Sequence, residues 1–77
     1  MQTKYDYLIF EKAAQQPAKT SAWDCKNAKS GTVLGTVKWH APWHQYCYFP
    51  TVQAVYSAGC LKDITHFMGQ LKNEGSC

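Results

Sequence analysis

The chain has 77 residues, with 8 lysines or arginines against 5 acidic residues, and a formal net charge of +3 at pH 7. A chain of this length is one small domain, residues 1–77, and it cannot enclose a large substrate cavity without losing its core. Every basic residue is a lysine, so the sequence lacks the arginine fork that reads guanine bases and clamps phosphates. These features weigh against a sequence-specific DNA reader.

The early sequence and the cysteines favour a reducing compartment. The longest early apolar run, residues 7–10, is shorter than the roughly 7–15 residues of a secretion signal and the roughly 20 of a membrane span. We therefore expect a cytoplasmic protein that contacts no membrane. Reduced thiols are the default in that compartment, so we expect no disulfide among the cysteines. These are Cys25, Cys47, Cys60 and Cys77.

The first half of the chain predicts two strands and a tight turn. The aromatic and β-branched run at residues 5–10 is typical of a strand, and the segment 11–20 after it is a polar loop. Residues 21–27 alternate apolar and charged side chains, with the period of two that a half-buried strand has. Gly31 follows in a short polar segment, where it can take the positive φ of a tight turn.

Two further strands are expected at residues 32–40 and 43–49, with a turn at Ala41 and Pro42 between them. Alternation along these strands assigns one set of side chains to the core face, and both tryptophans of the hairpin are among them. This set is Val33, Val37, Trp39, Trp43, Cys47 and Phe49. The opposite face then carries Lys38, His40, His44, Tyr46 and Tyr48.

The apolar period changes to 3.6 near the end of the chain, which predicts a helix over residues 58–72. Its apolar stripe consists of Cys60, Leu61, Ile64, Phe67, Met68 and Leu71. Ser57 is a good N-cap, and Gly75 marks the C-terminal side of the helix. Gly69 would allow the helix to approach the sheet closely, and residues 74–77 are expected to form a mobile tail.

Four strands followed by one helix, with short connections, predict an α+β fold. We expect two layers, in which a three- or four-stranded antiparallel meander sheet packs on one C-terminal helix, in the order ββββα. The expected core comprises Trp23, Val33, Val37, Trp39, Cys47, Phe49, Leu61, Ile64, Phe67, Met68 and Leu71. The first strand is the least fixed element, because it could swap into a second copy of the chain.

The segment between residues 38 and 48 raises a metal hypothesis. His40, His44 and Cys47 have the spacing H-x3-H-x2-C, and these are ligands that zinc accepts. Pro42, however, turns the chain between the two histidines, and strand parity sends Cys47 away from His44. The pattern therefore favours a polar hairpin with two surface histidines, without a metal or another cofactor.

A catalytic hypothesis would pair a cysteine nucleophile with His40, His44 or His66, oriented by an aspartate. Asp24 and Asp63 are the aspartates available for that role. No nucleophile elbow, glycine-rich phosphate loop or carboxylate pair accompanies these residues. We therefore expect no enzymatic activity and no catalytic residue.

A binding hypothesis uses the sheet face turned away from the helix. Amphipathic tyrosines among lysines and histidines suit either a protein hot spot or the stacking of unpaired bases. The partner-binding residues expected on this face are Lys26, Lys38, His40, His44, Tyr46 and Tyr48. The alternative is a solvated sheet, whose tyrosines only pair across neighbouring strands.

Three segments carry a resemblance to a known family. They are Leu34-Gly-Thr-Val-Lys-Trp39, Trp43-His-Gln-Tyr-Cys-Tyr-Phe-Pro50, and Gly59-Cys-Leu-Lys-Asp-Ile64 with Phe67. Over residues 21–71 the chain resembles short phage, prophage and bacterial proteins with the pattern LGxVxW…WxQYxxFP…CLxDIxxF. That family has no established activity, so the resemblance implies a phage or mobile-element setting and carries over no activity or site residue. His44 stands where the family pattern usually has arginine.

Two functions remain open from the sequence. The first is a small non-catalytic interaction module, an accessory protein that binds and modulates a larger protein. The second is weak, lysine-driven nucleic-acid binding through the same sheet face, with steep salt dependence and little base preference. The sequence leaves the oligomeric state open, a dimer included.

Overall fold

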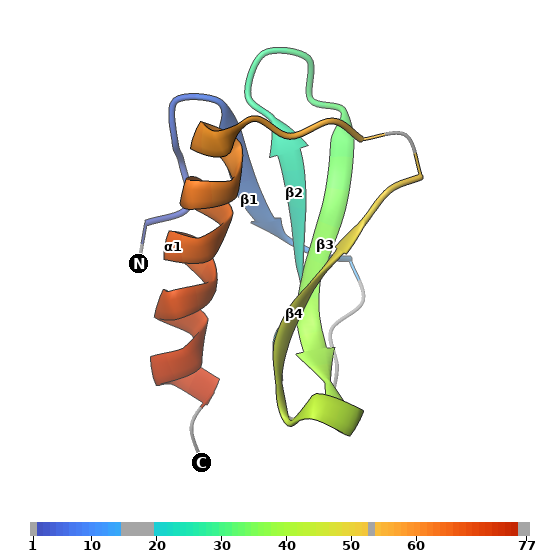
Figure 1. Cartoon of the computed structure of the whole chain (residues 1–77), viewed down its shortest axis with the longest axis vertical. Coiled ribbons are helices and arrows are strands. Elements are labelled where there is room, and N and C mark those ends of the chain that lie inside the picture. Colours follow the sequence, from blue (N-terminus) through green and yellow to red (C-terminus); the bar gives the residue numbers. More distant parts are fainter. Residues whose placement is uncertain (1, 15–19, 53, 76–77) are drawn as a thin grey trace.

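The computed structural model describes residues 2–14, 20–52 and 54–75, and the side chains of the helix as far as Leu71. The described residues form four strands, one turn of 3-10 helix and one α-helix. These elements are β1 (Leu8–Lys12), β2 (Trp23–Asn27), β3 (Val33–His40), the 3-10 turn Ala41–Trp43, β4 (Gln45–Pro50) and α1 (Ala58–Gly75). The strands pair antiparallel in the order β1-β2-β3-β4, and α1 packs on one face of the sheet (Figure 1). The predicted ββββα meander is therefore confirmed.

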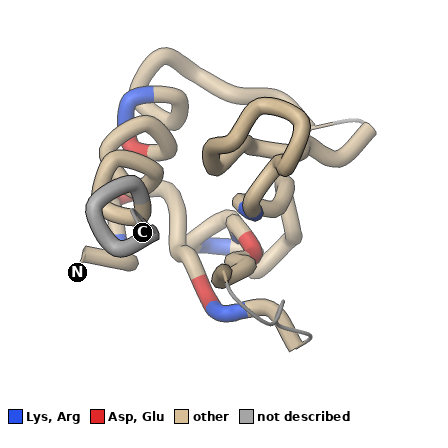
Figure 2. The backbone as a smooth tube through the Cα atoms, turned by 90° about the horizontal axis from the view of Figure 1, so that it is seen from below, with Lys and Arg blue, Asp and Glu red and all other residues tan. Residues whose placement is uncertain are grey.

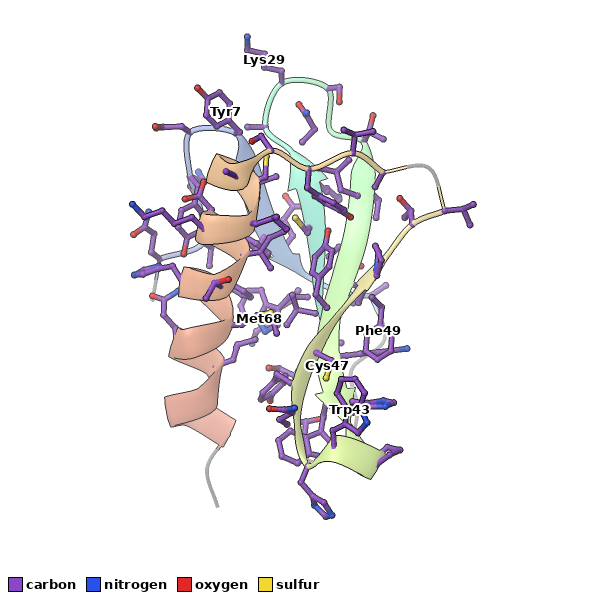
Figure 3. The ribbon with its side chains drawn as sticks, viewed as in Figure 1. Tyr7, Lys29, Trp43, Cys47, Phe49 and Met68 are labelled. Carbon is purple, nitrogen blue, oxygen red and sulfur yellow. The ribbon has the colours of Figure 1, made fainter. Side chains whose placement is uncertain are left out.

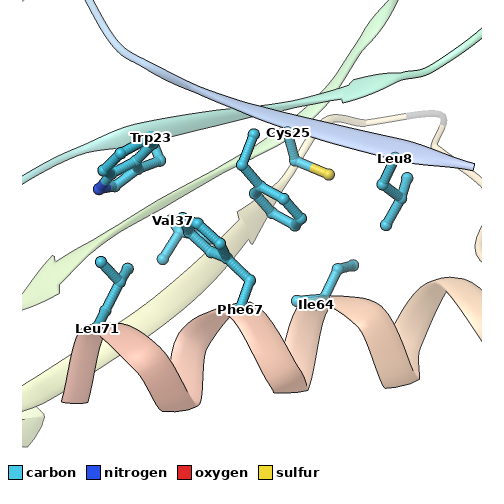
Figure 4. Packing of buried hydrophobic residues seen from close by; sticks show 8 residues of the cluster. Leu8, Trp23, Cys25, Val37, Ile64, Phe67 and Leu71 are labelled. Atoms are coloured by element: carbon cyan, nitrogen blue, oxygen red, sulfur yellow. The ribbon is translucent and has the colours of Figure 1, made fainter. Parts of the chain in front are cut away.

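The core lies between α1 and the sheet face turned toward it, which we call the inner face (Figure 4). Phe67 is at its centre: its ring stacks on that of Phe10 at 4.0 Å and meets the edge of Trp23 at 5.3 Å. Burial confirms Trp23, Val37, Ile64, Phe67 and Leu71 as core residues. Leu8, Phe10 and Cys25 complete the core, and the alternating pattern had not assigned Leu8 and Phe10 to it.

The helix begins as predicted. The Ser57 hydroxyl accepts a hydrogen bond from the Cys60 backbone N–H at 3.2 Å, which is the geometry of an N-cap. Leu61 is 53% exposed, because it lies at the margin of a stripe centred on Ile64, Phe67 and Leu71. Its assignment to the core is wrong. The helix runs through Gly75, and residues 76–77 of the expected tail lie outside the described residues.

The N-terminal strand begins three residues later than expected. Residues before Leu8 turn back along it, in a segment that we call the N-terminal hook, residues 2–7. The Tyr5 N–H donates to the carbonyl of Leu8 at 2.8 Å, and the Phe10 N–H donates to the carbonyl of Thr3 at 2.8 Å. Apolar composition predicted a strand at 5–10, but the chain reverses within that run.

A β-bulge changes the face of one expected core residue. Cys25 is opposite Gly35, whereas Lys26 is opposite Val33, so Leu34 is an extra residue on β3. Leu34 packs partly against the core, and Val33 shares the outer face with Lys26. Val33 is 40% exposed, which corrects its assignment to the core.

The β3–β4 hairpin reverses the expected faces of β4. His40 is opposite Gln45, so four residues, 41–44, form the loop; His44 has a φ of 51°. This register places Tyr46 opposite Trp39 and Tyr48 opposite Val37, on the inner face. Cys47 and Phe49 consequently lie on the outer face. The expected burial of these two residues and the expected outward position of the two tyrosines are both wrong.

Trp39 and Trp43, expected together on the core side, also separate. Trp39 is half-buried on the inner face, where it meets the edge of Tyr46 at 5.4 Å. Trp43 belongs to the loop and is 65% exposed. The strand expected from residue 43 begins only at Gln45, because the 3-10 turn occupies the residues before it.

Gly35 and Gly69 have different surroundings: Gly35 is crowded and Gly69 is open. Tyr48 covers Gly35 so closely that an added Cβ would lie 2.5 Å from the tyrosine Cζ and hydroxyl and 2.8 Å from the Phe49 carbonyl oxygen. Gly69, by contrast, is exposed, and nothing would lie within 4 Å of its Cβ. The close approach expected at Gly69 is therefore wrong. Gly31 has the positive φ expected in its turn, 74°.

Candidate functional site

Four side chains of the β3–β4 hairpin come together on the outer face of the sheet, and we call them the hairpin cluster. They are Lys38, His40, Trp43 and Phe49. The His40 ring meets Trp43 at 5.1 Å and Phe49 at 5.6 Å, both edge to face. The Lys38 ammonium lies 4.7 Å above the centre of the Phe49 ring. Figure 3 shows Trp43 and Phe49 on the side of β4 away from α1.

The local sequence explains how the cluster forms. Lys38 and His40 are alternate residues of β3 and therefore share its outer face. Pro42 occupies the start of the 3-10 turn, where its fixed φ is compatible with the helix, and His44 ends the turn in the left-handed conformation. The turn carries Trp43 back beside His40. Two strands and a loop of defined shape thus position the four side chains.

The inner face supports the hairpin from behind. The Trp39–Tyr46 ring contact lies directly across the sheet from the cluster, and the Tyr46 hydroxyl accepts a hydrogen bond from the Ser21 N–H at 3.3 Å. The Tyr48 hydroxyl pairs with that of Tyr56 at 2.8 Å. These bonds hold β4 against β2 and the segment before α1, so the cluster rests on a fixed platform.

The predicted binding residues divide into three groups. Lys38 and His40 lie in the cluster, and exposed His44 follows it in the loop. Lys26 is also on the outer face but pairs with Glu11 at 2.7 Å, a hydrogen bond that raises the pKa of Lys26. Tyr46 and Tyr48 point to the core, which corrects their place in the binding surface.

Sequence reasoning missed Trp43 and Phe49 as surface residues. Both were assigned to the core from their apolar character alone, although a two-residue turn at 41–42 would already have placed residue 43 opposite His40 on the outer face. The available signal was the length of the loop: four residues between His40 and Gln45 place odd positions of β4 on the outer face. A Pro-containing loop of that length was the feature to count.

Burial governs the protonation of the Cys25 thiol and the Tyr48 hydroxyl, which lie near the core. Burial raises the pKa of the Cys25 thiol, and a protonated thiol is a poor nucleophile. Burial is also the main cause that raises the pKa of Tyr48, followed by its hydrogen bond to Tyr56. His66 of α1 hydrogen-bonds the Tyr5 hydroxyl of the N-terminal hook at 2.8 Å. Within the described residues, no three His, Cys, Asp or Glu side chains are grouped to hold a metal ion.

Acidic residues are absent from the sequence around the cluster. No aspartate or glutamate occurs between Asp24 and Asp63, a stretch that contains four lysines and two of the three histidines. Figure 2 shows red segments on β1, β2 and α1, and only blue and neutral residues along the β3–β4 hairpin. The hairpin itself therefore offers only positive or neutral side chains. The nearest acid on the outer face is Asp24 of β2, whose carboxylate accepts a hydrogen bond from the Thr36 hydroxyl at 3.4 Å.

Comparisons with family models, with curated proteins and with solved structures gave no match to this chain. In the described part of the chain, the helix lacks the apolar length that crossing a membrane requires.

Proposed function

We propose that this protein is a small non-catalytic interaction module that binds a larger protein through the hairpin cluster. The observation that best supports this proposal is that Trp43 is 65% exposed, although it lies on a loop of defined shape. A tryptophan in water contributes nothing to the core, whereas tryptophans are among the residues that dominate binding energy in protein interfaces. The resemblance to short phage and bacterial proteins is compatible with an accessory role.

The composition of the cluster supports a protein partner. Trp43 and Phe49 offer apolar area, and Lys38 and His40 offer charge and hydrogen bonds beside it. An apolar centre with a polar rim is the usual anatomy of a protein interface. The absence of acidic residues between Asp24 and Asp63 favours a partner surface with carboxylates.

Nucleic-acid binding is the competing function, and the charges of the outer face disfavour it. Glu11 and Asp24 lie opposite each other on that face, and Lys26 is already paired with Glu11. Lys38 is then the one lysine in the hairpin cluster. A single lysine supplies too little positive charge to bind a row of backbone phosphates. We expect a titration with single-stranded or double-stranded DNA at low salt to stay flat.

The function is tested by affinity capture from cells that produce the protein, with wild-type and Trp43→Ala baits. We expect a specific protein to be captured by the wild type and lost with Trp43→Ala. Tyr7→Ala is the matched control, because Tyr7 is also an exposed aromatic, 59%, at the opposite end of the molecule (Figure 3). Its bait should capture the same protein.

Stability measurements complete this test. Trp43→Ala should change the free energy of unfolding by less than about 0.5 kcal/mol, as expected for an exposed side chain. Capture of the same protein by wild-type and Trp43→Ala baits would contradict the proposal, and so would the absence of any captured protein.

A further inference from the structure

We propose that the outer edge of β4 receives an extended, acidic segment of the partner as a fifth strand of the sheet. This inference rests on the proposed function, and it names the kind of partner and the way it binds. An added strand would take its affinity from main-chain hydrogen bonds and its specificity from alternate side chains. The hairpin cluster lies on the outer face next to this edge.

The backbone ladder identifies the groups that point outward from β4. The Thr51 N–H donates to the Leu34 carbonyl at 3.0 Å, which makes these two residues a hydrogen-bonded pair. Such pairs recur at every second position of an antiparallel ladder, so Gln45, Cys47 and Phe49 also bond to β3. The N–H and C=O groups of Tyr46 and Tyr48 therefore point away from β3.

The opposite edge of the sheet is partly covered by the chain itself. Tyr7 pairs with Ala28 through a hydrogen bond of 2.9 Å, so by the same alternation the Leu8 and Phe10 backbone groups point outward from β1. The hook pairs with one group of each residue: the Tyr5 N–H donates to the Leu8 carbonyl, and the Thr3 carbonyl accepts from the Phe10 N–H. No comparable backbone partner of Tyr46 or Tyr48 occurs among the residues that the structure describes.

The β4 edge also lacks the usual protection against pairing. Natural edge strands are blunted by charged side chains, bulges or covering segments. β4 has six residues, Gln-Tyr-Cys-Tyr-Phe-Pro, none of them charged, and its proline stands at the last position. In Figure 1 β4 crosses in front of β3 while α1 lies to one side, on the inner face. One edge of this sheet is therefore partly covered by the N-terminal hook, whereas the β4 edge is left able to pair.

The charge around the edge selects an acidic occupant. Lys38 is directly opposite Cys47 on the outer face, and His40 is opposite Gln45, so a fifth strand would lie one strand away from both. A second copy of this chain, paired through its own β4, would bring a second acid-free hairpin to the same edge. Carboxylates on the outward side of a partner strand, about 10 Å across β4 from Lys38 and His40, would instead complement their charge.

The test begins with selection of binders from a display library of random linear peptides about twice as long as β4. We expect the selected peptides to be rich in aspartate and glutamate and to alternate these with apolar residues. Lys38→Glu should weaken the best peptide by about tenfold or more. Lys29→Glu is the matched control, because it makes the same charge change at the far end of the sheet (Figure 3) and should leave affinity within about twofold.

The decisive measurement is hydrogen exchange of single amides by NMR, with and without the selected peptide. We expect the Tyr46 and Tyr48 amides to exchange at least about tenfold more slowly when the peptide is bound. The Cys47 and Phe49 amides, which already bond to β3, should change little. This alternation is specific to strand addition, since binding to the side chains alone would not produce it.

The outcomes separate the two proposals. A peptide that binds through Trp43 without slowing the Tyr46 and Tyr48 amides would overturn the fifth strand and leave the interaction module in place. Selection of basic peptides, or of no peptide at all, would likewise overturn the proposal of an acidic fifth strand. The interaction module would still be tested separately by affinity capture from a lysate. A β4-paired dimer would be seen as concentration-dependent protection of the same amides without any peptide, and it would refute the assigned occupant.

Discussion

At the scale of single residues, the two glycines make opposite predictions for the same substitution. Gly35→Ala should lower the free energy of unfolding by about 1–3 kcal/mol, because the new methyl group overlaps the Tyr48 ring and the Phe49 carbonyl. Gly69→Ala should raise it by about 0.5–1 kcal/mol, because alanine favours the helix and the methyl group meets nothing. Urea denaturation of both variants measures these changes. Equal effects at the two positions would mean that Tyr48 does not lie over Gly35.

At the scale of elements, the first turn of α1 depends on one hydroxyl. Ser57→Ala removes the acceptor for the Cys60 N–H and should lower the free energy of unfolding by about 0.5–2 kcal/mol. Ser57→Asp keeps a capping oxygen and should restore most of the loss. A thermal or urea melt of the three proteins measures the effect, and an unchanged midpoint for Ser57→Ala would show that the cap is not needed.

The elements were predictable to the extent that their signals are local. The helix was found from its period, its Ser57 cap and its terminal glycine, all contained in one segment. Strand order followed because short connections between alternating segments favour a meander. The hook was missed because residues 5–10 have the composition of a strand, and only the bonds of Tyr5 and Phe10 to distant backbone groups reveal the reversal.

The candidate site was predicted in part for the same reason. Lys38 and His40 were placed correctly, since alternation within one strand needs no knowledge of its neighbours. The faces of β4 depend instead on whether the loop has an even or an odd number of residues, because opposite residues of neighbouring strands share a face. The assignment of Val33 to the core was wrong for a similar reason, because the bulge at Leu34 shifts the register of Val33 against β2. The pairing between strands therefore fixes the face on which each side chain lies, and the pattern within a single strand does not show this pairing.

At the scale of the whole molecule, burial of ionisable groups predicts how stability depends on pH. Below about pH 8.5 the Cys25 thiol is protonated in both the folded and the unfolded chain, so it adds no pH dependence. Above that pH the unfolded thiol loses its proton while burial keeps the folded one protonated, because its pKa is raised. The free energy of unfolding should therefore fall as pH rises, by at most about 1.4 kcal/mol per pH unit for this group.

The Tyr48 hydroxyl extends this loss of stability to higher pH. Its pKa is also raised in the folded chain, chiefly by burial, so the decline should continue past about pH 10, where unfolded tyrosines ionise. Urea denaturation with a reductant at a series of pH values measures the curve. Cys25→Ala should be less stable throughout but should lose the slope between about pH 8.5 and 10. An identical slope in that variant would assign the dependence to other groups.

The hairpin loop of residues 41–44 has a consequence for the evolution of this surface. Since side chains of a strand alternate, deletion of one loop residue would shift β4 by one position against β3. Tyr46 and Tyr48 would then face solvent, and Cys47 and Phe49 would turn to the helix. A length change of a single codon in that loop would thus exchange the outward and inward side chains of β4 without altering one of its amino acids.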